Sequence, residues 1–246
     1  VLLHGQISES TAQDSASTET IRLTDYAHQG IDYLALGHVH QYQEGSLDGR
    51  GSWCYPGCLE GRGFDECTQH GFVLLDVDEA THQIRRQLVD ISQRHLWTVP
   101  LEVQGLDSSM AIVRRARALL SLLSGTPSAD PEIAEIPAER VEAILQAGAG
   151  VRMRPQDLVK LELRGALSMD AELNLDFIRT QLAPMFYYLR VVDETRRFID
   201  PSMYQHDKSL KGAFVHSVEA DATLDEQTKA AVIEAGLRLL RGEELL

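Results

Sequence analysis

The sequence predicts an α/β layered first part over residues 1–92 and a smaller α+β accessory domain over residues 93–246. The first ninety or so residues read as a strand, a helix, a strand and then a run of strands, which is the element order of a layered α/β fold. After Ile91 the composition changes, and separate helical and strand patterns follow one another without an internal repeat. These two observations carry the prediction of fold class.

Periodicity and turn residues place the elements of the first part. Strands are expected at Val1–Leu3, Asp32–Leu36, Ser52–Tyr55, Phe72–Asp78 and Gln83–Asp90. The last two form a hairpin around Glu79–Thr81, and Pro56-Gly57 is a turn. Gly5–Asp14 is polar and loop-like. A helix is expected at Thr18–Gln29, with Thr18 or Thr20 as its N-cap and Gly30 beyond its end.

The second part contains the same kinds of signal in a different order. Strands are expected at Leu96–Val103, Leu158–Arg164 and Tyr187–Thr195, and helices at Ser109–Leu123, Ala138–Ala147, Asn174–Leu182 and Leu224–Leu240. Between the first two helices, Gly125–Pro137 is rich in Pro, Ser, Thr and Ala and reads as a linker near residues 125–137.

Composition and charge narrow the classes of function. Hydrophobic residues make up 43% of the chain and charged residues 24%, the balance of a protein with a real core. No stretch approaches the roughly 20 apolar residues needed to cross a bilayer, so we expect no membrane association and a cytoplasmic location. The formal net charge of −14 does not favour nucleic acid over the surface as a whole, although a local basic groove could offset it.

Three cysteines, Cys54, Cys58 and Cys67, lie within fourteen positions. Cys54-x3-Cys58 has no second pair, so a four-ligand zinc site would need histidines such as His70. We favour the simpler interpretation of three reduced, partly buried thiols in a cytoplasmic protein.

The start of the sequence is unusual for a domain. It lacks an initiator Met, a basic region and the apolar stretch of a signal peptide. Val1-Leu2-Leu3-His4 instead reads as the middle of a buried strand. We therefore expect a fragment of a longer protein, or a gene model that has lost its front.

Three histidines are the candidate metal ligands. His4, His38 and His40 each lie at the carboxyl end of a predicted strand, where α/β sheets build their sites. If the segment is extended, the side chains of His38 and His40 project the same way. If it turns, the two side chains diverge and can bind two neighbouring ions. Gly37 lets the backbone pass close to a ligand or a metal. Neutral imidazole is the commonest nitrogen ligand for divalent transition metals, although each histidine alone could be structural.

The residues around these histidines resemble a known family. Asp32–Gln41 (DYLALGHVHQ) is similar to the last metal-binding motif of calcineurin-like metallophosphoesterases, and Leu2–Gly5 (LLHG) is similar to the preceding histidine motif. Tyr55–Glu66 and Gly71–Val77 resemble the turn and strand that close the catalytic domain in SbcD-like DNA repair exonucleases. The resemblance covers about residues 1–92, and it implies the C-terminal half of a metallophosphoesterase sandwich.

The resemblance also implies a function. His4 and His38 would bind one metal ion of a pair and His40 the other, with Mn²⁺ as the expected metal. Two such ions, about 3.5–4 Å apart, hydrolyse phosphodiesters by activating water and clamping the phosphate. The implied activity is that of a DNA repair exonuclease. The implied partners are DNA, a coiled-coil ATPase subunit and a second copy of the chain, with residues from about 95 onward discriminating substrates.

The chain also departs from the family pattern. The motifs Asp-x-His, Gly-Asp-x-x-Asp and Asn-His do not occur in residues 1–246, so a bridging carboxylate and a general-acid histidine are missing. We therefore do not expect this chain alone to be an efficient nuclease. Two alternatives remain open. The net negative charge of the chain favours a metallophosphoesterase acting on a nucleotide or phosphoprotein. The missing motifs favour a non-catalytic binding or regulatory module.

A few other side chains are candidates for substrate contacts. Arg62 could meet a phosphate, and Gln41 could orient a ligand through a hydrogen bond beside His40. We interpret Arg114, Arg115 and Arg117 as a solvated helix face, and Phe186-Tyr187-Tyr188 as core packing at the start of a strand rather than as a base-stacking site.

Overall fold

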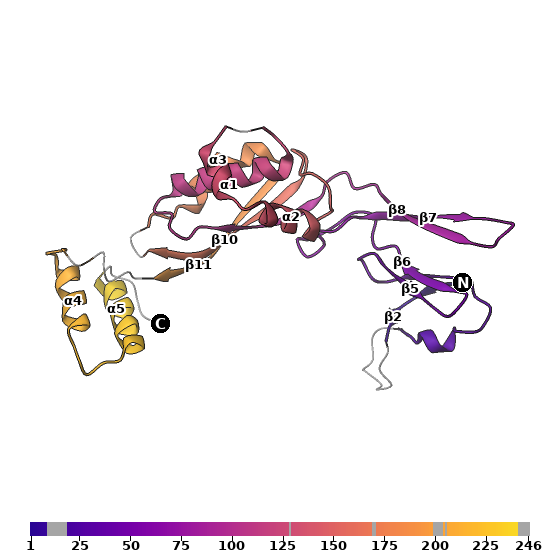
Figure 1. The fold of residues 1–246 in the computed structure, drawn as a ribbon, viewed down its shortest axis with the longest axis horizontal. Helices are drawn as coiled ribbons and strands as arrows, with labels where there is room; N and C mark the ends of the chain where they lie inside the picture. Colours follow the sequence, from indigo (N-terminus) through magenta and orange to yellow (C-terminus); the bar gives the residue numbers. More distant parts are fainter. Residues whose placement is uncertain (9–18, 128, 169–170, 199–203, 205, 241–246) are drawn as a thin grey trace. The chain divides into compact units, whose positions relative to one another are not determined.

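The computed structural model describes residues 1–8, 19–127, 129–168, 171–198, 204 and 206–240 (Figure 1). Within these residues the fold is mixed α/β, as the sequence predicts, and it contains four sheets and five α-helices. The chain divides into two compact units: Val1–Val99 with Arg115–Leu161 and Leu182–Arg190, and Pro100–Arg114 with Glu162–Gln181 and Val191–Leu246. The boundary expected near residue 92 stays a prediction.

A four-stranded sheet carries the candidate metal ligands. Its strands are β1 (Leu2–His4), β4 (Tyr33–Gly37), β6 (Ser52–Tyr55) and β5 (Gln43–Ser46), in that order across the sheet. β1 and β6 are parallel to β4, and β5 is antiparallel to β6. Leu34 and Leu36 are buried on β4, as the period of two in a half-buried strand requires. β5 was not expected, because its sequence QEGS carries no apolar alternation.

The helix expected over Thr18–Gln29 is wrong. Residues Thr20–Ile21 instead form strand β3, which pairs in parallel with β2 (Gln6–Ile7). β2 itself lies in the segment Gly5–Asp14, which was expected to be a loop. Ile21 is only 5% exposed and packs in the hydrophobic core of the sheet, so burial and strand pairing outweigh a local helical preference. A single 3-10 turn, η1 (Leu23–Asp25), remains. Thr18 lies outside the described residues.

The first strand, expected to be buried, is largely exposed, and so are apolar side chains of the hairpin. β1 is an edge strand of its sheet, and Leu2 is 84% exposed. β7 (Gly71–Val77) and β8 (Ile84–Asp90) form the expected antiparallel hairpin, but within the described residues they form a sheet of their own. A two-stranded sheet covers neither of its faces, so Phe72 and Leu74 on β7 are exposed to solvent.

The remaining elements follow the sequence closely. A three-stranded sheet has the order β11 (Tyr188–Phe198), β10 (Leu158–Ser168), β9 (Leu96–Glu102). The helices are α1 (Ser109–Ser124), α2 (Ala138–Ala147), α3 (Leu175–Leu182), α4 (Leu210–Glu219) and α5 (Glu226–Leu240), with short 3-10 turns η2 (Pro131–Glu135) and η3 (Ala183–Met185). Of these helices, only α4 was not expected. In the described part of the chain, no helix combines the length and apolar character needed to cross a membrane.

Candidate functional site

Strand register brings His4 and His38 together. β1 and β4 are parallel neighbours, and His4 lies directly opposite Gly37, so His38 follows at the same edge of the sheet. The two imidazole rings meet edge to face, with their centroids 5.5 Å apart. A Cβ atom at Gly37 would lie 2.8 Å from Nδ1 of His4, so the His4 ring can occupy this position only beside a glycine.

The backbone of His38 is strained. Its φ angle is +110°, a value that residues other than glycine rarely adopt. Strain of this kind typically costs about 1–3 kcal/mol and persists where the surrounding structure holds the residue in place, often at functional sites. The chain therefore turns immediately after β4 instead of continuing as a strand, and His38 and His40 are both exposed.

His40 lies against Glu66 and Arg62. Its Nδ1 atom is 2.7 Å from Oε1 of Glu66, and Oε2 of the same carboxylate accepts the backbone N–H of Arg62 at 2.8 Å. The Arg62 N–H and, next, the His40 side chain lower the pKa of Glu66, so the carboxylate is ionised and can only accept hydrogen bonds. Nδ1 of His40 therefore carries the ring proton, and Nη2 of Arg62 lies 2.8 Å from Nε2 and 3.0 Å from Nδ1 of the same ring.

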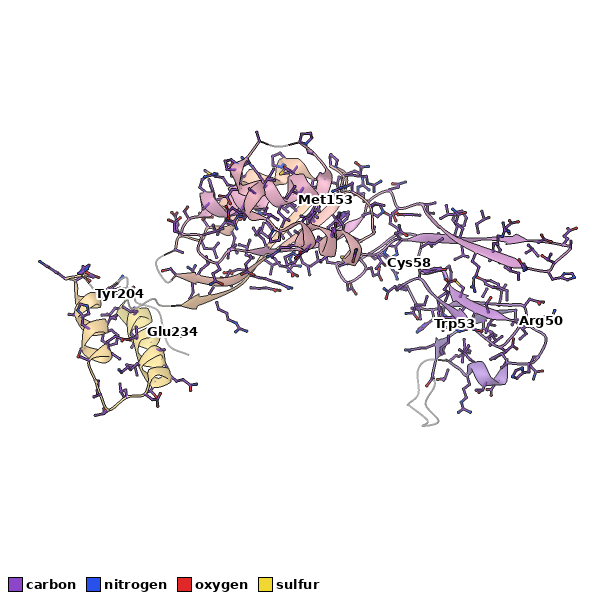
Figure 2. The ribbon with its side chains drawn as sticks, in the orientation of Figure 1. Arg50, Trp53, Cys58, Met153, Tyr204 and Glu234 are labelled. Atoms are coloured by element: carbon purple, nitrogen blue, oxygen red, sulfur yellow. The ribbon has the colours of Figure 1, made fainter. Side chains whose placement is uncertain are left out.

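A short irregular segment after β6 brings the chain beside His40. Residues 56–58 form neither a turn nor a bend, so the turn expected at Pro56-Gly57 is not found, although Gly57 has a φ of +82°, which favours glycine. A Cβ at Gly57 would lie 2.7 Å from the backbone oxygen of His40. The next residue, Cys58, donates its backbone N–H to that oxygen at 3.0 Å. Cys58 consequently lies beside His40, in the segment between β6 and β7 (Figure 2).

A mixed set of metal-binding side chains surrounds Cys58. One ligand atom each from His40, Cys58 and Glu66 lies within 4.8 Å of the others. Sγ of Cys58 is 3.3 Å from Nδ1 of His70, whose Nε2 lies 2.9 Å from the backbone oxygen of Glu66. Burial, and then the charge of Glu66, raise the pKa of the Cys58 thiol, so the sulfur holds its proton when no ion is present.

Gln41 does not join this cluster by any described contact. It lines a separate pocket of about 320 Å³, together with Tyr42, Thr68, Gln69, Leu88, Gln146, Gly148 and Ala149. The pocket offers amide and hydroxyl groups and no charged side chain. The expectation that Gln41 orients a ligand beside His40 stays a prediction.

The core-packing interpretation of Phe186-Tyr187-Tyr188 is correct only for Phe186, which is buried. Tyr187 is 65% exposed and Tyr188 is 48% exposed. Tyr188 stacks on Phe64 with ring centroids 6.4 Å apart, and the guanidinium of Arg94 lies 4.0 Å above the Tyr187 ring. We call the stacked pair of half-buried Phe64 and exposed Tyr188 the aromatic platform; Nζ of Lys160 lies 5.8 Å from the centroid of the Phe64 ring, which adds positive charge beside it.

The arginines of α1 differ in their surroundings. Arg115 is partly buried and its Nε atom pairs with Oε2 of Glu132 at 2.5 Å. Arg114 and Arg117 are exposed, as a solvated helix face requires. The interpretation of the three as a solvated face therefore holds for two of them.

A scan against models of protein families finds no match to this chain, and a search of curated proteins finds none either. The geometry of the site therefore carries the functional interpretation.

The sequence alone did not single out Glu66, Cys58 or His70 as a group. Cys58 and His70 appeared only in the zinc alternative, and Glu66 was not a candidate. The local signal was the Pro56-Gly57 dipeptide, directly after which Cys58 hydrogen-bonds to the histidine motif. Reading that signal requires knowing that β4 and β6 are adjacent and parallel.

Proposed function

We propose that this chain supplies three metal-binding histidines of a two-metal phosphoesterase centre that hydrolyses phosphodiester bonds in DNA, as in SbcD-like exonucleases. In this proposal the sheet β1-β4-β6-β5 is part of a metallophosphoesterase sandwich. The observation that carries the proposal is the meeting of His4 and His38, with ring centroids 5.5 Å apart at the carboxyl ends of parallel strands.

The donor set fits a divalent transition metal. His4 and His38 present neighbouring imidazoles, and Gly37 leaves the space that the His4 ring occupies. When bound, a metal pair would activate a water molecule and stabilise the charge that develops on the phosphoryl oxygens. The missing carboxylate motifs mean that these histidines are only a part of such a centre.

Arg62 can contribute directly to phosphate binding. Its guanidinium lies against His40, and its side chain is exposed, so it can turn toward a phosphate beside the histidines. A guanidinium binds phosphate oxygens in a planar, paired geometry that an ammonium group cannot match. Its positive charge would neutralise the negative charge of the phosphodiester group that is hydrolysed.

The aromatic platform favours a nucleic-acid strand over a small phosphoester. Exposed aromatic rings beside cationic side chains are the means by which proteins hold single strands, each stacked base contributing about 1–3 kcal/mol. Phe64 comes two residues after Arg62 in the chain. These local cations and aromatic rings favour binding of a nucleic-acid strand at this place, although the net negative charge of the whole chain disfavours it.

Manganese binding tests the metal centre directly. We expect the chain to bind Mn²⁺, measured by loss of the free-ion electron paramagnetic resonance signal, and His4→Ala and His38→Asn to reduce this affinity by at least about tenfold. Asparagine suits His38 because it tolerates positive φ. His82→Asn is the matched control, since His82 is an exposed histidine with a φ of +57°. Unchanged binding in both ligand variants would show that the site is wrong.

Substrate class requires a second comparison. Anisotropy of a labelled single-stranded oligonucleotide should report binding by the chain, with nucleoside monophosphates competing poorly. Equal competition by the mononucleotide would support the nucleotide alternative, and absence of both Mn²⁺ and strand binding would support the non-catalytic module.

A further inference from the structure

We propose that His40, Cys58 and Glu66 hold a zinc-class ion, with His70 as the neighbouring fourth donor. This ion is distinct from the one expected on His4 and His38. The proposal shares His40 with the proposed function but uses none of its other ligands, so either proposal can fail alone.

The donor atoms are already close to the spacing that one ion requires. Zinc binds nitrogen and oxygen at about 2.0–2.2 Å and sulfur at about 2.3 Å, which puts tetrahedral donors roughly 3–4 Å apart. The atoms of His40, Cys58 and Glu66 lie within 4.8 Å of one another. The sulfur of Cys58 is 3.9 Å from Oε2 of Glu66 and 3.3 Å from Nδ1 of His70. Shifts of about an ångström would therefore bring His40, Cys58 and Glu66 to the spacing of one ion. His70 lies outside this set and approaches only the Cys58 sulfur, so it would have to move further to become the fourth donor.

Hydrogen bonds hold the donors in ligating orientations. The backbone oxygen of Glu66 lies 2.9 Å from Nε2 of His70 and can only accept, so this nitrogen carries the proton and the lone pair of Nδ1 points toward the Cys58 sulfur, whose S–H it can accept. Imidazoles that bind metals are commonly oriented in this way, by a backbone carbonyl at the other ring nitrogen. His70 is only 3% exposed, which fixes the ring further.

The chemistry of the set selects the metal. A thiolate and a carboxylate together neutralise a dication, and a thiolate ligand favours zinc over manganese. Arg62 opposes binding, because its Nη2 atom lies 2.8 Å from Nε2 of His40. An ion bound through Nδ1 of His40 would move the ring proton to Nε2, which could then no longer accept from Arg62. The guanidinium, which is exposed, would turn away.

Cobalt substitution gives a readout specific to sulfur. We expect the reduced full chain to bind Co²⁺ with a thiolate-to-cobalt charge-transfer absorption band, which Zn²⁺ abolishes and Mn²⁺ does not. Cys58→Ser should remove the band. Cys67→Ser is the matched control, because the Cys67 sulfur contacts Phe64 and Thr98 instead of the cluster.

The remaining variants separate this site from its neighbour. Glu66→Gln keeps the side-chain shape and should weaken Co²⁺ binding about 10- to 100-fold, whereas Arg62→Gln should tighten it. His4→Ala and His38→Asn should leave the band unchanged, whatever they do to Mn²⁺ binding. Circular dichroism of each variant checks that it is folded. No sulfur band in the parent chain, or a band that survives Cys58→Ser, would overturn the proposal.

Discussion

The hydroxyl of Tyr55 donates a hydrogen bond of 2.7 Å to the backbone oxygen of Gly5, the residue that follows His4. The hydroxyl oxygen of Tyr55 in turn accepts the backbone N–H of Ile7 at 3.0 Å. Tyr55 is 1% exposed and lies on β6, with β4 between its strand and β1. One buried side chain therefore fixes the path of the chain immediately after a candidate metal ligand.

Removing this hydroxyl should destabilise the fold. Tyr55→Phe leaves a buried carbonyl and a partly buried N–H without their partner, and we expect the free energy of unfolding to fall by about 1–3 kcal/mol. Urea denaturation measures the change. Tyr26→Phe is the control, since Tyr26 packs at the edge of the same core without a described hydroxyl bond. Equal effects in the two variants would show that the bonds to Gly5 and Ile7 contribute nothing measurable.

A methyl group at Gly37 should displace the His4 ring without unfolding the protein. Gly37→Ala would put a Cβ 2.8 Å from Nδ1 of His4, and His4 is exposed, so its side chain can rotate away. We expect Mn²⁺ affinity to fall by about tenfold or more, with little change in the urea midpoint. Gly49→Ala, where the added Cβ would meet no atom within 4 Å, should alter neither quantity.

Relieving the backbone strain at His38 should stabilise the fold, and the same substitution should remove metal binding. At a φ of +110°, His38→Gly removes an unfavourable backbone conformation, and we expect a gain of about 1 kcal/mol in the free energy of unfolding. The same variant should lose Mn²⁺ binding. His38→Ala separates the two effects, since alanine removes the imidazole and keeps the strain. A glycine variant less stable than the alanine variant would contradict this account.

Strand patterns placed His4 and His38 at the carboxyl ends of strands, and the family resemblance paired them; their rings meet because β1 and β4 are parallel neighbours. The His40–Glu66 contact was not expected, because Glu66 lies in a segment without strand or helix periodicity. Likewise, the pairing of Ile21 with Ile7 overrode the local helical pattern of its segment. Sequence patterns therefore predicted the strands with apolar alternation but not β2, β3 and β5, and the contacts made by loops could be seen only in the fold.

Acid sensitivity should centre on Asp48, which organises the loop between β5 and β6. Its carboxylate accepts the backbone N–H groups of Gly51 at 2.7 Å, His28 at 2.6 Å and Arg50 at 2.8 Å. These bonds, with that of Gly51 the largest influence, lower the pKa of Asp48 from 3.8 to about 2. The folded state therefore binds this proton less readily than the unfolded state.

The sign of the pH dependence follows from that difference. A carboxyl whose pKa is depressed on folding stabilises the protein fully above its unfolded value of 3.8, and the contribution disappears as the pH falls toward about 2. Asp48→Asn cannot ionise and loses one acceptor, so it should be less stable than the parent near neutral pH. In urea titrations, the free energies of unfolding of the two proteins should converge as the pH falls from 3.8 toward about 2. Asp76→Asn, an exposed change on β7, should follow the parent at every pH. The free energies of unfolding of the parent and of Asp48→Asn could instead differ by the same amount down to pH 2. Hydrogen bonds from the backbone to the ionised carboxylate would then not be the cause of the difference.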